Sequence, residues 1–238
     1  GFPLDRRWLL IEKDGRFISQ RTTPLLGQIQ ITQADLHLRV NYPGMQELLL
    51  DYHPTHSKQV QATIWKDSVA GNWVSAECDA WFSDLLERPV QLVHMDDQVS
   101  RPLVKEQLPY ERSFEVSFAD GYPYLLTNQS SLEDLNQKLE HPIGMDRFRS
   151  NLVVSGFKAF EEDHWKKIRI GSVEFLLVKP CARCQVTTLD QKSGVSSKEP
   201  LKTLATYRKQ DGKVMFGMNL VALNTGVVNI NDPIKIYT

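Results

Sequence analysis

The sequence predicts a mainly β protein of the α+β class, with a few short helices. Segments in which apolar and polar residues alternate recur along both halves of the chain, and turn residues separate them. Only three segments show the longer period of a helix. At 238 residues the chain is long enough for one large domain or two small ones.

The first part, residues 4–75, is a succession of short expected strands. Residues 7–11 and 16–19 flank an Asp-Gly pair ending at Gly15, which is typical of a hairpin turn. Further strands are expected at residues 28–32, 36–40, 48–50 and 60–65. Six or more strands joined by polar turns indicate a small barrel or sandwich.

Residues 79–88 form the first expected helix. Trp81 and Phe82 each have a leucine four residues further on, and Asp79 is placed to cap the helix N-terminus. We expect this aromatic pair to lie in the core rather than to bind a ligand, because such stripes are usually buried.

A domain boundary is expected after this helix. Residues 90–93 form another strand, and the stretch that follows is polar and contains Pro102. The boundary is therefore expected near residues 95–112, which gives domains at 1–100 and 101–238.

The second domain is also rich in expected strands and contains two more helices. One covers residues 127–139, where Ser130 and Glu133 form a capping box, and the other runs from Pro200 to Arg208. Strands are expected at 152–155, 165–170, 173–178, 186–189, 216–223 and 234–237.

Two polar residues precede the strand at 152–155. Side chains alternate in a strand, so Arg149 and Asn151 are expected on the same face. A guanidinium beside a carboxamide suits phosphate groups and pterin edges, although paired arginines are more often a solvated surface.

Two of the three cysteines lie close together, and we place the chemistry there. Cys184 follows Arg183 and lies between two expected strands. A thiolate is a nucleophile and a soft metal ligand, and a neighbouring cation favours it. Cys184 is therefore the candidate centre of the site.

Three other interpretations of Cys181 and Cys184 stay open. A structural zinc site usually needs a second pair of ligands, and only Cys78 and six scattered histidines are left. A redox dithiol is expected at a helix N-terminus, whereas the flanks here resemble strands. The third interpretation is a pair of buried structural thiols.

Composition excludes several classes of function. A net charge of −1 and a pI near 6.7 provide no global field that would attract nucleic acid or an anionic membrane. No apolar run approaches the roughly 20 residues of a membrane helix. An odd number of cysteines fits a reducing compartment, so a cytoplasmic protein is expected. The start at Gly1, without an initiator methionine, indicates a cut or engineered N-terminus.

The cysteine motif resembles a known signature. The run Lys179-Pro-Cys-Ala-Arg-Cys-Gln-Val-Thr-Thr188, with Gly194 and residues 199–204, is similar to the core of MOSC-domain proteins, in the branch of the YcbX-like proteins and mitochondrial amidoxime-reducing components. Further matching blocks are Asp5-Arg6, residues 118–126, 147–151 and 162–165, and Phe216-Gly217 with Asn219.

This resemblance implies a fold, a cofactor and a set of residues. Residues 1–100 would form an N-terminal β-barrel-like module that lacks its first strand, and residues 101–238 a MOSC β-barrel domain. The cofactor would be molybdopterin with molybdenum, held by Cys184 as the metal ligand. The resemblance further implies these cofactor-binding residues: Arg6, Asp120, Gly121, Ser131, Arg149, Asn151, Ala182, Arg183 and Asn219.

The resemblance also implies an activity. It predicts a molybdenum-dependent oxidoreductase that reduces small N-hydroxylated molecules, namely N-hydroxy bases, amidoximes and hydroxylamines, with Cys184 and Asp120 as catalytic residues. Two alternatives remain, a sulfur-transfer protein with a persulfide on Cys184 and a non-catalytic cofactor carrier. A third alternative is a purely structural protein that tolerates loss of the Cys184 thiol.

The chain departs from the family pattern in three ways. It starts after the strand that ends in a cofactor-contacting Lys-Ser pair, and Ser150 stands where proline is usual. It ends without the ferredoxin-like domain of many bacterial members, and three cysteines build no iron–sulfur cluster within this chain. A separate ferredoxin-like or flavin reductase partner is therefore expected to donate electrons.

Overall fold

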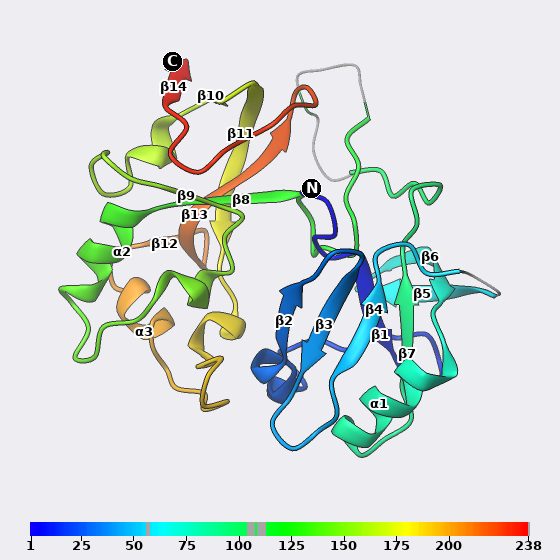
Figure 1. Cartoon of the computed structure of the whole chain (residues 1–238). Coiled ribbons are helices and arrows are strands. Elements are labelled where there is room, and N and C mark those ends of the chain that lie inside the picture. The colour runs from blue at the N-terminus through cyan, green and yellow to red at the C-terminus, as the bar shows by residue number, and fades with distance from the viewer. Residues whose placement is uncertain (56–57, 104–107, 109–112, 238) are drawn as a thin grey trace. The chain divides into compact units, whose positions relative to one another are not determined.

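The computed structural model describes residues 1–55, 58–103, 108 and 113–237 (Figure 1). They form two compact units. The first unit comprises Gly1–Leu103, Glu115–Asp120 and Lys192–Gly194, and the second comprises the described residues of 104–114, 121–191 and 195–238. The boundary expected at residues 95–112 falls partly on residues outside this description.

Two antiparallel sheets build the first unit. The larger sheet has the order β1-β7-β6-β5, and the smaller has the order β2-β3-β4. The strands are β1 (Trp8–Ile11), β2 (Gln30–Gln33), β3 (His37–Asn41), β4 (Leu48–Asp51), β5 (Gln59–Ile64), β6 (Asp67–Trp73) and β7 (Gln91–His94), and a short 3-10 helix, η1, spans Pro24–Gln28. Six strands precede residue 75, as expected, but their set differs: residues 16–19 form only isolated bridges, and β6 was not expected.

The core of the first unit follows from the alternation of its strands. In β3 and β4 the buried residues Leu38, Val40, Leu48 and Leu50 alternate with exposed or half-buried ones, so one face of the small sheet packs inward. They form a cluster with Phe82, which lies on the helix α1 (Ala76–Leu86). This confirms Phe82 as a core residue.

The N-cap of α1 differs from the expectation. The cap is Ser75, whose hydroxyl oxygen accepts a hydrogen bond from the amide of Cys78 at 3.1 Å. Asp79 instead accepts from the indole of Trp73 and from the amide of Leu92, both at 2.8 Å. Serine and aspartate cap equally well, and tertiary contacts with β6 and β7 engage the aspartate.

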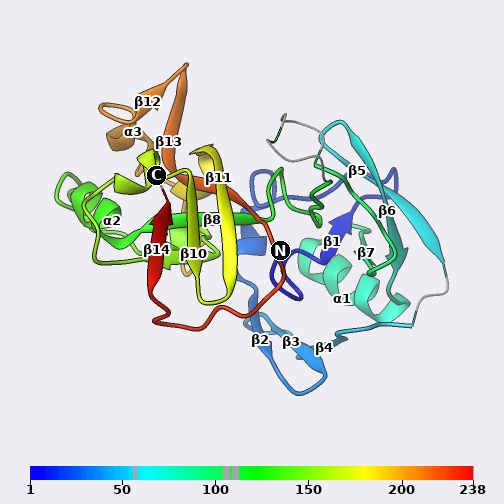
Figure 2. The same cartoon turned by 90° about the horizontal axis from the view of Figure 1, so that it is seen from above.

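A curled sheet of seven strands dominates the second unit (Figure 2). Its order is β14-β10-β11-β13-β8-β9, with β12 paired to β13, and only β8 and β9 run parallel. The strands are β8 (Tyr124–Asn128), β9 (Leu152–Val154), β10 (Lys167–Ile170), β11 (Val173–Ala182), β12 (Lys209–Gln210), β13 (Lys213–Ala222) and β14 (Ile234–Tyr237). The expected hairpin between β10 and β11 is present.

Short helices cover this sheet. They are α2 (Gln129–Asn136), α3 (Leu201–Leu204) and the 3-10 helices η2 (Met145–Phe148), η3 (Glu161–His164) and η4 (Gln185–Thr188). The cap of α2 is Asn128, which accepts from the amide of Ser130, so the expected Ser130–Glu133 capping box is wrong. The core beneath consists of Leu132, Leu135, Phe148, Leu204 and Phe216.

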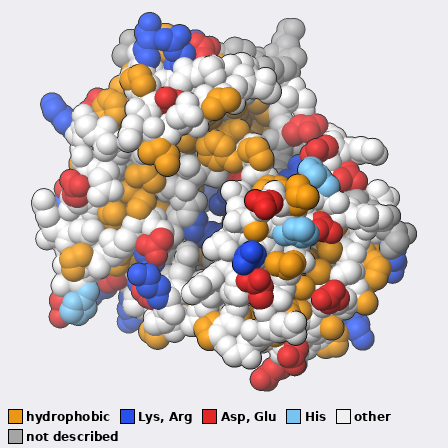
Figure 3. Space-filling model, in the orientation of Figure 1, with side chains coloured by type: hydrophobic (Ala, Val, Ile, Leu, Met, Phe, Trp, Pro, Cys, Tyr) orange, Lys and Arg blue, Asp and Glu red, His pale blue; other side chains and the backbone are white. Residues whose placement is uncertain are grey.

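The face of the molecule that Figure 3 shows carries no single dominant charge. Acidic and basic side chains are interspersed on this face (Figure 3), in agreement with the net charge of −1. An anionic ligand must therefore be held by local cations. Among the described residues, no helix combines the length and apolar character needed to cross a membrane.

Candidate functional site

The cysteine motif lies at the end of β11, the second strand of the β10–β11 hairpin. Strand β11 ends at Ala182, which pairs with Met215 of β13, and the ladder shifts register on either side of Pro180. The amide of Arg183 donates to the carbonyl of Val214 at 2.8 Å, so the neighbouring strand fixes the backbone up to Arg183. Cys184 is the first residue beyond this support, and it is half-buried.

The segment after Cys184 differs from the expectation. Residues 186–189 were expected as a strand, but Gln185–Thr188 form the 3-10 helix η4, with Cys184 in extended conformation before it. The hydroxyl of Thr187 donates to the carbonyl of Cys184 at 3.0 Å, and that of Thr188 to the carbonyl of Gln185 at 2.7 Å. These local bonds stabilise a turn, which overrides the strand preference of the two threonines.

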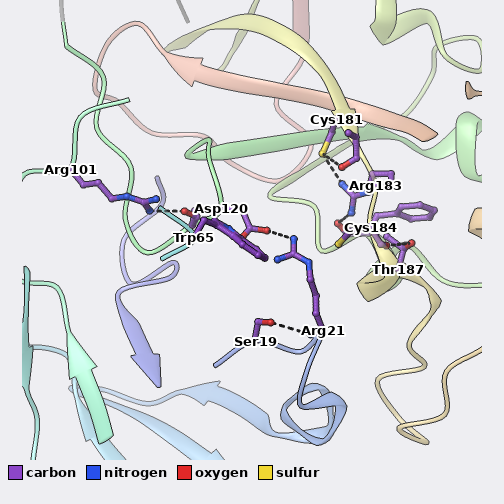
Figure 4. A network of polar contacts seen from close by, with 12 residues as sticks. Ser19, Arg21, Trp65, Arg101, Asp120, Cys181, Arg183, Cys184 and Thr187 are labelled. Atoms are coloured by element: carbon purple, nitrogen blue, oxygen red, sulfur yellow. Dashed lines mark hydrogen bonds and ion pairs between the residues drawn. The ribbon is translucent and has the colours of Figure 1, made fainter. Parts of the chain in front are cut away.

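Arg183 contacts the first thiol of the motif rather than the second (Figure 4). One terminal nitrogen of its guanidinium donates to Cys181 Sγ at 3.1 Å, and the other donates to the carbonyl of Phe148 at 2.7 Å. Its Nε is buried and has no hydrogen-bond partner among the described residues. A buried donor of this kind needs an acceptor, which an ordered water or a ligand can supply.

The residues before Arg149 support the cysteine segment from the core side. Arg147 forms an ion pair with Asp190 at 3.1 Å and donates to the carbonyl of Thr187 at 3.4 Å, which ties η2 to η4. Phe148 is fully buried and stacks on Phe216, with ring centroids 4.0 Å apart. The loop around Cys184 therefore rests on a close-packed aromatic pair.

Arg149 and Asn151 do not share a strand face. Arg149 ends η2 in the left-handed region at φ 54°, so the period-two alternation expected there does not apply. Asn151 binds β8 through two hydrogen bonds to Leu125, both at 2.9 Å. Its side-chain oxygen accepts from the backbone amide of Leu125, and its backbone amide donates to the Leu125 carbonyl.

The remaining candidates of the second unit fall into two places. Asn219 lies on β13 opposite Lys179 and donates to the carbonyl of Pro180 at 3.4 Å, so it adjoins the cysteine motif, as do Ala182 and Arg183. Ser131 lies on α2 and is fully buried; its hydroxyl donates to Glu162 at 2.9 Å and accepts from the amide of Phe160 at 2.7 Å.

This buried network makes stability depend on pH. Burial raises the pKa of Glu162, which is 0% exposed, above its ordinary value of 4.5. The folded state then binds the proton more tightly than the unfolded state does. The free energy of unfolding is therefore expected to fall as the pH rises above 4.5, until the raised pKa is passed.

Urea unfolding at a series of pH values tests this expectation. Glu162→Gln removes the titrating group and should flatten the decline. Glu140→Gln, at a side chain that is 91% exposed, should leave it unchanged. Equal slopes in the wild type and in Glu162→Gln would contradict the assignment.

Arg6 and Asp120 belong to the first unit. Arg6 has φ 54° and forms an ion pair with Asp5 at 2.6 Å, and its carbonyl accepts from the amide of Phe118. Asp120 accepts from Arg21 at 2.8 Å and from the indole of Trp65 at 3.1 Å (Figure 4). Arg6 is thus fixed to the segment that leads to Asp120.

Gly121 stands in open space. A Cβ atom built there would meet no other heavy atom of the described residues within 4 Å. Any steric need for glycine at this position would therefore come from a ligand.

Comparison with known proteins identifies the family. Residues 113–235 match the MOSC domain, and residues 1–89 match the MOSC N-terminal beta barrel domain. This chain belongs to the MOSC-domain family.

Curated relatives of this MOSC-domain protein cover almost the whole chain. It is 36% identical over 239 residues to "Mitochondrial amidoxime-reducing component 1" of Danio rerio, and this alignment covers 97% of the chain and 73% of the relative. It is 34% identical over 244 residues to component 2 of Rattus norvegicus and 33% identical over 242 residues to component 2 of Homo sapiens, each covering 97% of this chain and 72% of the relative.

The residues of this MOSC-domain protein fit the molybdenum cofactor that its family implies. Among the described residues, no group of three or more His, Cys, Asp or Glu side chains could hold a metal ion. The Cys184 thiolate would be a suitable soft ligand for the metal of that cofactor. The unpaired Nε of Arg183 offers a donor to the same group.

Sequence reasoning missed Arg21 and Trp65 of this MOSC-domain protein. Residues 60–65 were expected as a strand, but β5 ends at Ile64 and Trp65 lies in the following turn. A tryptophan in a two-residue turn, where glycine or asparagine is usual, is a signal that could have identified it.

Proposed function

We propose that this protein is a molybdenum-cofactor oxidoreductase that reduces N-hydroxylated compounds, such as N-hydroxy bases, amidoximes and hydroxylamines. The observation that carries the proposal is the half-buried Cys184 at the end of β11, directly after an arginine with an unpaired buried Nε. The names of the relatives, amidoxime-reducing components, support the choice of substrate class.

In this proposal each residue near the motif has a defined task. The Cys184 thiolate holds the molybdenum, and Arg183 donates from Nε to an acceptor of the cofactor. Further proposed contacts to the pterin and its phosphate come from Arg6, Gly121, Arg149, Asn151, Ala182 and Asn219. Ser131 is left out because its hydroxyl is buried and already bonded to Glu162 and Phe160.

The proposed reaction consumes two electrons and two protons. The N–O bond breaks, the nitrogen gains one proton in place of the hydroxyl group, and the oxygen takes the other proton and leaves as water. When bound, the molybdenum cofactor supplies the two-electron chemistry that side chains do not provide. Asp120 moves a proton to the departing oxygen through its carboxyl group. A ferredoxin-like or flavin-containing partner delivers the electrons.

The assay that tests the proposal supplies electrons artificially. Cofactor-loaded protein is mixed with an aromatic amidoxime and a chemically reduced dye in the absence of air. One amidine and one water are expected for every two electrons consumed. Fully loaded protein that gives no amidine would contradict the reductase and favour a cofactor carrier. Metal-free protein with a persulfide on Cys184 would favour sulfur transfer.

Gly121→Ala separates cofactor binding from folding. The added methyl group meets no atom of the described residues within 4 Å, so the free energy of unfolding should stay within about 1 kcal/mol of the wild type. We expect the molybdenum content to fall because the methyl group enters the proposed ligand space. Metal analysis and chemical denaturation measure the two effects.

Gly44→Ala is the matched control for this change. Gly44 is equally open but has φ +84°, where a side chain is strained. It should lose stability and keep its molybdenum. Full molybdenum content in Gly121→Ala would remove Gly121 from the proposed site.

A further inference from the structure

Trp65 occupies a position where turn chemistry favours a small residue. Strands β5 and β6 are joined by a two-residue turn, since Ile64 pairs with Asp67, and Trp65 adopts φ 57° in it. A bulky residue in the left-handed region costs on the order of 1–3 kcal/mol and persists only where other contacts hold it. The side chain is also 47% exposed, so burial in the core does not explain it.

The contacts of Trp65 converge on one carboxylate. The guanidinium of Arg21 lies 4.4 Å above the indole ring, and Phe17 packs edge-on at 4.9 Å. The indole Nε1 donates to Asp120 Oδ1 at 3.1 Å, while Arg21 donates to Oδ2 at 2.8 Å (Figure 4). Each carboxylate oxygen therefore has its own donor, and the two donors are stacked on each other.

The backbone on both sides of this contact is fixed by one buried arginine. Arg101, which is 6% exposed, donates to the carbonyls of Ser117 and Ala119 at 2.7 Å. Its other terminal nitrogen forms an ion pair with Asp67, directly after the turn, at 2.8 Å. The segment that carries Asp120 and the turn that carries Trp65 thus share one anchor.

Arg101 fixes the backbone, so the contacts of Trp65 and Arg21 determine only the orientation of the Asp120 side chain. The Asp120 side chain remains 61% exposed and keeps room to accept a further hydrogen bond. Holding a surface carboxylate from both oxygens does little for folding, because exposed ion pairs contribute little stability. A strained tryptophan engaged in this way indicates a functional constraint.

We propose that Trp65 and Arg21 are positioning residues that hold the Asp120 carboxylate in one orientation, in which it takes a proton from water and passes it to the departing oxygen. This inference rests on the proposed function and deepens it. The two residues act through Asp120, not on the substrate. Their removal is expected to slow proton transfer and to leave substrate and cofactor binding unchanged.

Trp65→Phe tests the role because it removes the Nε1 donor and keeps a ring beneath Arg21. Loss of one hydrogen bond to a charged group predicts a kcat lower by about tenfold, with KM and molybdenum content unchanged. The solvent isotope effect on kcat should rise with it, because the proton-transfer step becomes slower. In Asp120→Asn the further Trp65→Phe change should have no additional effect on kcat, because both act on one group.

Trp73→Phe is the matched control within the same unit. It removes another indole bond to a carboxylate, from Trp73 to Asp79 at 2.8 Å, and should leave kcat and its solvent isotope effect unchanged. If Trp65→Phe leaves kcat and the solvent isotope effect unchanged, or if its effect adds fully to that of Asp120→Asn, the positioning role is overturned.

NMR of the Trp65 indole proton in metal-free protein provides a readout independent of activity. The proton should be protected from exchange, and Asp120→Ala, which removes the acceptor, should remove most of the protection. A protected proton in loaded protein that reduces no substrate overturns the proposed function and the positioning role, but not the contact. An unprotected proton in active protein overturns the inference alone.

Discussion

Cys184→Ser is expected to leave the protein folded and to remove most of its molybdenum. A serine hydroxyl stays protonated near neutral pH and is a hard oxygen donor, so it replaces a thiolate poorly as a ligand. Loss of a residue that only orients a metal ligand already lowers affinity by about 10–100-fold, and loss of the ligand itself should exceed that. Reduction of an amidoxime should fall at least as far. Metal analysis and the dye-coupled assay measure both effects.

Cys181→Ser is the control for this experiment. Cys181 lies three residues earlier and contacts the guanidinium of Arg183 at 3.1 Å. A serine there can still accept that hydrogen bond, so molybdenum and activity should change little. Equal losses in the two variants would contradict the assignment of Cys184 as the ligand, as would full molybdenum content in Cys184→Ser.

Phe216→Ala is expected to have the largest effect on stability. Phe216 is 0% exposed and stacks on the equally buried Phe148 with an interplanar angle of 16°. Truncating a buried phenylalanine typically costs about 3–5 kcal/mol of unfolding free energy. The Phe148 carbonyl binds Arg183, so the cysteine loop should also loosen and lose molybdenum.

Chemical denaturation of Phe216→Ala and Phe216→Leu measures this effect. The leucine variant keeps much of the apolar volume and should lose clearly less stability. A cost below about 1 kcal/mol for the alanine variant would show that this aromatic pair is not the support of the second unit.

Alternation of apolar and polar residues predicted most of the strands, because burial of one sheet face leaves this pattern in the sequence. It wrongly predicted strands at residues 16–19 and 186–189, and it missed β6 and β12. The β10–β11 hairpin and the packing of Leu132 and Leu135 followed from apolar patterns in the sequence. Helix caps did not. Ser75 and Asp79 both can cap α1, and only the contacts of Asp79 with Trp73 and Leu92 decide between them.

The candidate site shows the same division. The motif around Cys184 was visible in the sequence, but the turn after it was not, since threonine hydroxyls formed local bonds that compete with a strand. Arg21 and Asp120 are 99 residues apart in the chain, so no local pattern connects them. The contacts of Arg183 with Cys181 and Phe148 likewise required the structure.

Ligation of molybdenum by Cys184 is tested most directly by X-ray absorption of protein that carries selenocysteine in place of Cys184. The selenium spectrum should show a molybdenum neighbour, and protein with selenocysteine in place of Cys181 should show none. A molybdenum neighbour at position 181 only, or at neither position in fully loaded protein, would contradict the account.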